Sequence, residues 1–429
     1  MNNYDIGQVN AYLHFGYLPD PEADLSALLG EINNSGFVNL SASSVNENEL
    51  VAIGVDCLKK AFGEAIREAG IERTHVIPLS GGLDSRAILC GLIENVDRSR
   101  IKAVTFGSPG TLDYEIGRMV AIVAGVEHQS IDLTSTEWKW SIEGLTSTAV
   151  QTEGPIWLFD AYVNRHMAEW FGKNCVYWSG FMGDPLAGSH LLARDSSSWS
   201  EARTRFTQRN QFCRRVRLSR ADFDAEMFLP DLPFASPTLL SYDEQIDFSI
   251  RQQCWIKKIV LPKGYDYRTP FLQPRWVHFI LGVPRYCRER QRLYKRILRV
   301  AYPEIFSLPT KANLGLPLGA SWYSVKARKL GMRLNSFLAR ALRIRRASPF
   351  VNYIDFDWAL RERKDLKTLV YEEILALKKR KILNWIDIET LWEAHQKGRG
   401  DFADALTLLA SLEINLKAGY FCEGGNDRG

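Results

Sequence analysis

The hexapeptide Ser-Gly-Gly-Leu-Asp-Ser at residues 80–85 carries the clearest chemical signal in this sequence. It follows a short apolar run and precedes a helical pattern, so it predicts a turn from a strand into a helix. Two adjacent glycines, Gly81 and Gly82, leave the backbone open to a ligand because neither has a Cβ atom. The hydroxyl groups of Ser80 and Ser85 then lie beside backbone amides and the positive end of the helix. This arrangement is typical of a site for a polyanion.

Asp84 adds a requirement to this loop. A carboxylate alone would repel a bound anion, so its presence predicts a divalent cation that bridges it to phosphate oxygens. The loop is not of the Walker type, since no Gly-Lys-Ser/Thr follows it. The simpler interpretation is a Gly-Gly turn that only joins a strand to a helix. The strand before the loop, the helix after it and the six residues of the hexapeptide, taken together, argue against that interpretation.

The segments around this loop alternate between strand and helix patterns. Short apolar runs typical of buried parallel strands occur at residues 75–79, 102–106, 130–133 and 174–179. Helical periodicity marks residues 47–69, 86–93 and 113–124. The alternation predicts an α/β fold with a parallel twisted sheet and flanking helices. Helical patterns dominate beyond about residue 320, and we expect a helical C-terminal subdomain over residues 321–429.

The overall composition narrows the class of protein. The chain has 429 residues, a formal net charge of +4 and 24% charged residues, which excludes a disordered chain and gives no reason to expect nucleic acid as a partner. No apolar run is long enough for a membrane span, and MNNYDIGQVN does not fit a signal peptide. Seven scattered cysteines without C-x-x-C spacing argue for a reducing compartment. We therefore expect a cytoplasmic protein.

Several further segments share their pattern with a known family. The loop resembles the pyrophosphate-binding loop (PP-loop) of the N-type ATP pyrophosphatases, which implies an adenine-nucleotide alpha-hydrolase-like fold. Within that group the chain is similar to the synthetase domain of the asparagine synthetase family, which includes β-lactam synthetase and lasso-peptide cyclase. The segments that carry this narrower resemblance are AYLHFGYLPDP at 11–21, VTFG at 104–107, DYEIGRMVAIVAGVEHQSIDL at 113–133, WSGFMGDPLAGSHL at 178–191, YRTPFLQPRWVHFILGVP at 267–284 and RLYKRILRVA at 292–301.

The resemblance covers about residues 10–320 and implies three parts. These are an N-terminal lead-in segment over residues 1–50, a PP-loop ATP pyrophosphatase or synthetase domain over residues 51–320, and the helical subdomain over residues 321–429.

The resemblance also implies a site for ATP and Mg²⁺. The residues that would bind ATP are Leu79, Ser80, Gly81, Gly82, Asp84, Ser85, Thr105, Phe106 and Gly180. Asp84 and Asp184 match the two carboxylates that hold Mg²⁺, and Asp184 is also a catalytic candidate. Lys295 matches the lysine that neutralises charge developing at the α-phosphorus. Taken singly, Lys295 could be one more solvated base and Asp184 a turn residue.

The implied reaction is the formation of an amide in two steps. The carboxylate of a small-molecule or peptide substrate attacks the α-phosphate of ATP, which gives an acyl-adenylate and pyrophosphate, and an amine or ammonia then displaces AMP. Asparagine synthetases carry an N-terminal glutaminase domain whose nucleophilic cysteine follows the initiator methionine, whereas the second residue here is Asn2. We therefore expect free ammonia, an amine substrate or a separate glutaminase to supply the nitrogen.

Three positions depart from the family pattern. Phe181 stands where asparagine synthetases have a glutamate near the reacting groups, and a phenyl ring cannot accept a proton. Pro185 replaces the usual acidic residue of this second loop, and Gln273 replaces the aspartate of the R-x-P-F-L-D segment. The phenylalanine argues against plain aspartate-plus-ammonia chemistry.

Two other functions stay open at this point. One is a catalytically degenerate, nucleotide-binding accessory protein of a biosynthetic complex, which Phe181 and Pro185 favour. The retained Asp84, Asp184 and Lys295 oppose it. The other is a PP-loop enzyme that modifies RNA, although the sequence has no C-x-x-C pair and no obvious RNA-binding module.

Arginine-rich stretches at residues 203–220, 285–299 and 326–346 are a further feature. They predict either a basic rim that captures an anionic substrate or, more simply, solvated helix faces. His190 lies just after the second loop and is a candidate substrate contact. A homo-oligomer is compatible with the sequence.

Overall fold

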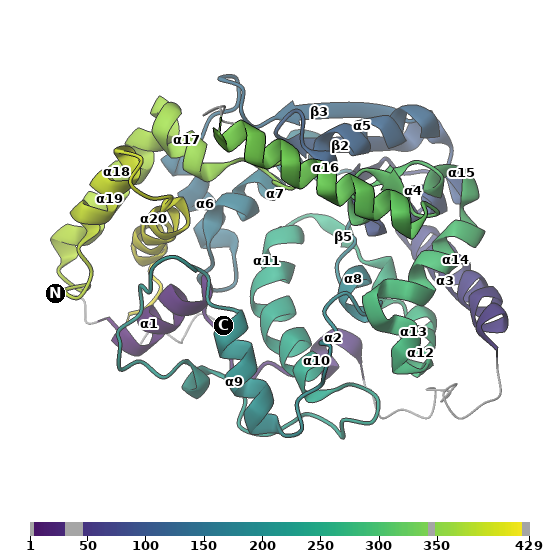
Figure 1. Ribbon diagram of the computed structural model, residues 1–429, viewed down its shortest axis with the longest axis horizontal. Helices are drawn as coiled ribbons and strands as arrows, with labels where there is room; N and C mark the ends of the chain where they lie inside the picture. Colours follow the sequence, from purple (N-terminus) through teal and green to yellow (C-terminus); the bar gives the residue numbers. More distant parts are fainter. Residues whose placement is uncertain (1–3, 31–45, 342–347, 423–429) are drawn as a thin grey trace.

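A five-stranded parallel sheet lies at the centre of the protein (Figure 1). The computed structural model describes residues 4–30, 46–341 and 348–422. The strand order is β3-β2-β1-β4-β5. The strands are β1 (His75–Pro78), β2 (Ile101–Gly107), β3 (Glu127–Asp132), β4 (Val176–Trp178) and β5 (Asp266–Arg268). The α/β fold class predicted from the sequence, with a parallel sheet between helices, is confirmed.

Both faces of this sheet are buried, because alternate residues of each strand point into different hydrophobic cores. Val76 and Val104 belong to one core, and Ile77 and Ala103 belong to the other. The second core contains residues of α3 (Glu47–Ala69), α4 (Asp84–Asn95), α5 (Leu112–Ala124), α12 (Pro274–Gly282) and α14 (Arg292–Ala301). The first contains residues of α1 (Ile6–Phe15), α6 (Ile142–Gln151), α7 (Leu158–Phe171), α18 (Lys364–Arg380) and α20 (Ala403–Lys417).

Helix α3 shows how local sequence sets these elements. The predicted helix over residues 47–69 has the same bounds in the structure. It begins with a capping box, in which the Asn46 side chain accepts from the Glu49 amide and the Glu49 carboxylate accepts from the Asn46 amide. Gly70 ends it with a positive φ of 90°.

Shorter elements connect these layers. Between β1 and β5 they are η2 (Arg98–Arg100), α8 (Gly183–Leu186), α9 (Trp199–Arg209), η3 (Ala225–Phe228), α10 (Tyr242–Ile246), the π-helical η4 (Asp247–Ile256) and α11 (Lys257–Val260), with α2 (Ser26–Leu29) near the N-terminus. After β5 come η5 (Pro270–Leu272), α13 (Arg285–Arg288), η6 (Glu289–Gln291), α15 (Pro303–Phe306), η7 (Lys311–Asn313) and α16 (Trp322–Ala341). A small antiparallel pair, β6 (Pro309–Thr310) and β7 (Leu316–Pro317), flanks η7.

The last part of the chain is helical, as the sequence predicts. Helices α17 (Phe356–Glu362) and α19 (Ile388–Gln396) pack beside α18 and α20, and α1 packs against α20. The Asp5 amide donates to the Phe421 carbonyl at 2.8 Å, so the two ends of the described chain lie side by side (Figure 1). Among the described residues, we find no helix with the length and apolar character that crossing a membrane would need.

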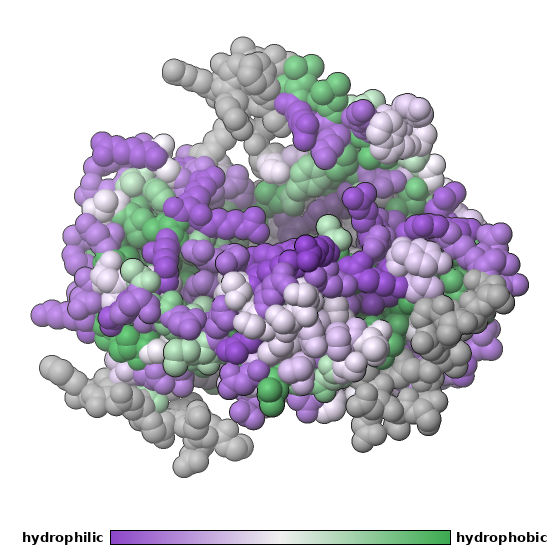
Figure 2. Space-filling view, turned by 60° about the horizontal axis from the view of Figure 1, so that its bottom comes forward, coloured by the Kyte–Doolittle hydropathy of each residue, from purple (hydrophilic) through white to green (hydrophobic). Residues whose placement is uncertain are grey.

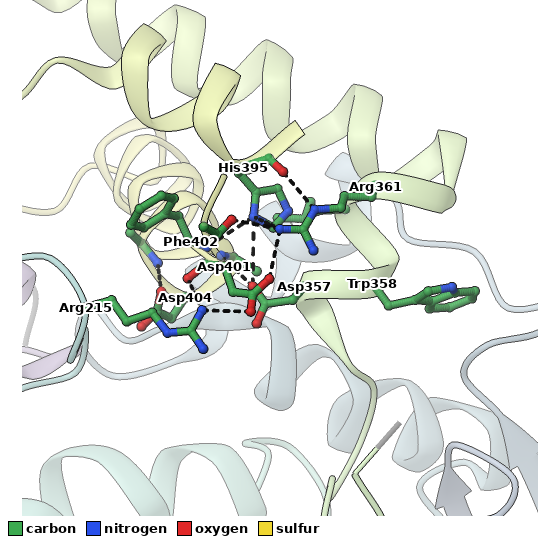
Figure 3. Close-up of polar contacts among 12 residues, drawn as sticks. Arg215, Asp357, Trp358, Arg361, His395, Asp401, Phe402 and Asp404 are labelled. Atoms are coloured by element: carbon green, nitrogen blue, oxygen red, sulfur yellow. Dashed lines mark hydrogen bonds and ion pairs between the residues drawn. The ribbon is translucent and has the colours of Figure 1, made fainter. Parts of the chain in front are cut away.

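A polar cluster joins the C-terminal helices to one another (Figure 3). Arg361 on α17 donates to the carbonyl groups of His395 (2.7 Å) and Gly400 (2.8 Å) and to the Asp401 carboxylate (2.9 Å). Arg215, which follows α9, forms an ion pair of 2.9 Å with the same Asp401. These contacts tie α17 to the segment before α20, and we assign the cluster a structural role.

His75 gives the fold a dependence on pH. It is fully buried on β1, and the Trp178 indole donates to its Nδ1 at 3.0 Å. Burial lowers the pKa of His75 to about 4, below the usual value of about 6.5. The unfolded chain therefore takes up a proton between these pH values that the folded chain does not, and stability falls as pH drops through this window. In urea unfolding followed from pH 7 to pH 4, His75→Gln should remove up to about 1.4 kcal/mol per pH unit from the slope. An unchanged slope would contradict this assignment.

Candidate active site

The two loops singled out in the sequence meet at one edge of the sheet. Strands β1 and β4 pair in parallel, with His75 opposite Val176, so their carboxyl ends lie side by side. The chain continues from β1 to β2 on one side of β1 and returns to β4 on the other. Such a reversal of strand order opens a crevice at the carboxyl edge, where open α/β sheets bind ligands.

The PP-loop begins directly after β1 in this crevice. Helix α4 follows it, and no described side chain caps the first turn of the helix at Leu83. Serine hydroxyls order the loop itself, because the Ser80 amide donates to Ser85 Oγ (3.2 Å) and the Gly82 amide to Ser80 Oγ (3.1 Å). An uncapped helix start beside two hydroxyls matches what an anionic ligand needs.

Gly81 fastens the loop to its surroundings through residues that the sequence patterns missed. Its amide donates to Asp113 Oδ1 (3.1 Å), and its carbonyl accepts from the Lys311 amide (2.9 Å). The Lys311 ammonium also forms an ion pair with Asp113. Arg86, fully buried behind the loop, donates to the Gly81 carbonyl at 3.4 Å. A Cβ atom at Gly81 would lie 2.9 Å from the Leu112 carbonyl oxygen, so this position requires glycine.

The residues expected near the adenine lie beside this loop. The Leu79 amide donates to the Val104 carbonyl (2.7 Å), and the Leu79 carbonyl accepts from Thr105 Oγ1 (2.9 Å). The Phe106 ring stacks on Tyr353, with 5.5 Å between centroids and 17° between planes. Tyr353 belongs to the segment expected to form a separate helical subdomain, so this segment also borders the carboxyl edge of β2.

Asp84 and Asp184 are brought together across the crevice. Asp84 is closely packed against the second loop, since a Cβ atom at Gly180 would lie 2.7 Å from its Cβ and one at Gly183 would lie 2.5 Å from its Cγ. The Tyr294 hydroxyl donates to Asp84 Oδ1 at 2.7 Å. Burial, followed by the negative charge of Asp184, raises the pKa of Asp84 well above its usual range. The two carboxylates therefore repel each other.

This repulsion is the test of whether Mg²⁺ fits the site. A hard cation with oxygen ligands would remove it, and Mg²⁺ in nucleotide sites is commonly held by one or two carboxylates together with substrate phosphates. The described residues contain no group of three or more acidic, histidine or cysteine side chains that could hold a metal without such a ligand. Asp84 and Asp184 thus fit a magnesium ion that arrives with a polyphosphate.

Lys295 completes the arrangement from helix α14. Its half-buried ammonium donates to the Arg290 carbonyl at 2.9 Å. Burial lowers the pKa of Lys295, and the charge of Asp184 opposes this shift, which places the ammonium within electrostatic reach of that carboxylate. Arg290 and Gln291 both adopt left-handed backbone angles, with φ of 53° and 61°, just before α14. The Gln291 amide group donates to the Asp184 carboxylate.

The second loop differs from the family pattern in ways that the structure explains. Phe181 is buried in the hydrophobic core, so no proton acceptor stands at this position. Met182 has a φ of 67°, in the left-handed region that residues with a side chain seldom adopt. Gly188, with a φ of 93°, has no room for a side chain, because a Cβ atom would lie 2.3 Å from the Arg288 carbonyl oxygen. His190, the candidate substrate contact, pairs with Asp247 at 2.7 Å.

Comparison with known protein families gives a match over most of the chain. Residues 58–417 match the sequence model of the family described as asparagine synthase. The matched region starts later than the resemblance read from the motifs, and it extends through most of the C-terminal helices. A search of curated proteins found no significant match.

Proposed function

Because the chain belongs to the asparagine synthase family, whose members are ATP-dependent amide ligases, we propose that it adenylates a substrate carboxylate and passes the acyl group to an amine or ammonia. The observation that carries the proposal is the convergence of Asp84, Asp184 and Lys295 beside the PP-loop. These residues come from three separate segments and meet at the crevice where a nucleotide fits.

In this proposal the PP-loop positions the polyphosphate of ATP. The β- and γ-phosphates lie at the uncapped start of α4, where Ser80 and Ser85 supply hydroxyl donors. Leu79, Thr105 and Phe106 border the adenine, with Gly180 on the side of the second loop. A side chain at Gly180 would collide with Asp84, because a Cβ atom there would lie 2.7 Å from the Asp84 Cβ.

The first step breaks the bond between the α-phosphorus and the oxygen that bridges it to the β-phosphorus. A carboxylate oxygen of the substrate attacks the α-phosphorus, and pyrophosphate leaves with the electron pair. Lys295 carries the positive charge that stabilises the oxygens of the α-phosphate as charge builds on them. Asp84 and Asp184 would hold Mg²⁺, and this ion would supply positive charge to offset that of the departing pyrophosphate.

The second step forms the amide. The nitrogen attacks the acyl carbon, AMP leaves with the electron pair of the bond from carbon to oxygen, and the nitrogen loses a proton. Phe181 offers no atom that can take this proton, so another acceptor serves here than the glutamate of asparagine synthetases. This difference supports an amine substrate other than the simple ammonia of plain asparagine synthesis.

A catalytically degenerate accessory protein is the second candidate. The buried Phe181 favours it, because the position has changed from a reactive side chain to a core residue. The repelling pair of Asp84 and Asp184 argues against it, since such a pair costs folding free energy and serves no purpose without a cation.

Exchange of labelled pyrophosphate into ATP tests the proposed function. Adenylation is reversible, so the purified chain should catalyse this exchange with a suitable acid drawn from a panel of amino, hydroxy and dicarboxylic acids, and without any amine. Exchange should stop when EDTA removes Mg²⁺, and hydroxylamine as a surrogate amine should trap the product as a hydroxamate. Binding of Mg·ATP without exchange for any acid would favour the accessory protein, and AMP release only with tRNA would favour the RNA-modifying enzyme.

A further inference from the structure

Beside the second loop lies a basic cavity that the proposed chemistry does not use. Its volume is about 580 Å³, and it lies between α9, the residues that follow α9 and the π-helical η4. The cavity begins at Ser189, whose amide donates to the Asp184 carbonyl at 3.1 Å, so it adjoins the proposed magnesium site. Figure 2, turned so that the bottom of Figure 1 comes forward, shows many hydrophilic residues on the side of the molecule that carries α9.

Four arginines line this cavity, and two of them have no counter-ion in the described part of the chain. Arg205 is paired with Glu201 at 2.5 Å. Within residues 4–30, 46–341 and 348–422, no carboxylate lies within ion-pair distance of Arg209 or Arg214. The fourth is Arg251, described next. The cavity therefore has an excess of positive charge beside the proposed site of ATP cleavage.

The remaining charged groups hold the wall of the cavity in place through contacts with one another, and they do not neutralise its excess positive charge. Asp247 accepts from His190 (2.7 Å) and from Gln252 (3.2 Å), and it lies 4.0 Å from Arg251. Burial alone would raise the pKa of Asp247, but the hydrogen bond and charge of His190, with the charge of Arg251, lower it overall. Arg251 also lies over the Trp255 ring, 5.3 Å from its centroid. Asp247, Arg251 and Trp255 all lie on the π-helical η4, a conformation that often marks functional sites.

The other acidic residue of the lining is also engaged. The Asp243 carboxylate accepts from the Ser196 amide (2.7 Å) and from the Ser196 hydroxyl (2.9 Å). It fixes the segment between the second loop and α9, and this leaves Arg209 and Arg214 free to meet an external anion.

From these contacts we propose that the cavity binds an anionic group, a carboxylate or a phosphate, at the far end of a small-molecule substrate whose other end reacts at the adenylation site. The part of this inference that concerns the reacting end of the substrate rests on the proposed ligase function. The volume lies in the range of small-molecule pockets, about 300–1,000 Å³, and is too small for a folded macromolecule. Guanidinium groups suit both kinds of anion because they donate two parallel hydrogen bonds.

The experiment compares anion binding by two matched double variants. Arg209→Ala with Arg214→Ala removes the two unpaired charges of the cavity. Arg118→Ala with Arg399→Ala removes two exposed arginines elsewhere, so the net charge changes equally. Inorganic phosphate and succinate serve as probes in isothermal titration, with sodium chloride keeping the ionic strength constant. All four positions are exposed, so both variants should fold, which circular dichroism would check.

The cavity variant should bind phosphate and succinate at least about tenfold more weakly than the wild type, and the control variant should bind them within about twofold. Both variants keep the PP-loop, so phosphate bound there would not produce this difference. Equal binding of phosphate and succinate by all three proteins would overturn the proposal. Weakening of this binding by chloride alone would also overturn it. Titration with Mg·ATP separates this result from the proposed function, because all three proteins should bind it equally, and failure to bind it would refute the ligase and leave the anion site standing.

Discussion

Lys295→Ala is expected to slow acid-dependent exchange of pyrophosphate into ATP by about 10²–10³-fold, while the affinity for Mg·ATP changes by only a few fold. The reason is that the charge on the α-phosphate oxygens grows mainly in the transition state, and an interaction made there raises the rate more than the binding. The half-buried ammonium, partly removed from water, makes this interaction stronger than it would be at the surface. Labelled pyrophosphate in the nucleotide fraction measures the rate, and isothermal titration measures the affinity.

Arg296→Ala is the matched control for this variant. Arg296 is the next residue on α14 and is also cationic, but its guanidinium pairs with Glu47 and donates to Asn48 at the start of α3. Its removal should leave exchange within about twofold of the wild type, since a surface ion pair contributes little. If the two variants lost activity equally, the loss would come from the helix and not from the charge of Lys295.

The framework of the fold could be predicted because its signals are local. The capping box at Asn46, the apolar run that forms β1 and the Gly-Gly turn each lie within a few residues. Strand β3 is harder to predict from the sequence. The pattern predicts residues 130–133, whereas the strand in the structure is Glu127–Asp132. This edge strand contains polar residues, so its hydrophobic pattern is weak. Strand β5 has only three residues and was not predicted.

The candidate site divides in the same way between local and long-range features. Asp84, Asp184 and Lys295 could be found because each lies in a segment that resembles a family motif. The contact between Tyr294 and Asp84 could not be found, because no local pattern shows which side chains meet across 210 positions. The same holds for Lys311, which meets Asp113 across 198 positions. Contacts of this kind depend on how α14 and the β6–β7 pair dock onto the sheet.

The arginine-rich stretches show how the fold, and not the net charge alone, sets the local charge. A net charge of +4 favours solvated helix faces when it is averaged over the chain. The fold instead gathers Arg205, Arg209, Arg214 and Arg251 around one cavity, and two of these come from a single helix. Local electrostatic potential depends on this placement and not on the sum of the charges.

Asp84→Asn should separate catalysis from folding, because we expect it to abolish exchange and yet to stabilise the protein in the absence of Mg²⁺. The buried Asp84 carboxylate faces the charge of Asp184, and an amide of the same shape removes this repulsion while it still accepts from the Tyr294 hydroxyl. We expect the free energy of unfolding without Mg²⁺ to rise by about 1–2 kcal/mol, as when an uncompensated buried charge is removed. Exchange should fall by at least about 10³-fold, because the proposed metal site loses one of its two carboxylates.

Urea unfolding with and without Mg·ATP measures both halves of this prediction. Wild-type protein should gain about 2.7 kcal/mol at a Mg·ATP concentration 100 times its dissociation constant, and Asp84→Asn should gain much less. Asp56→Asn, at an exposed position paired with Lys60, is the control and should match the wild type in stability and exchange. A less stable Asp84→Asn protein that retained exchange would show that Asp84 is a structural residue. The magnesium site would then have to be sought elsewhere, because the repulsion between Asp84 and Asp184 is the physical reason for placing a cation between them.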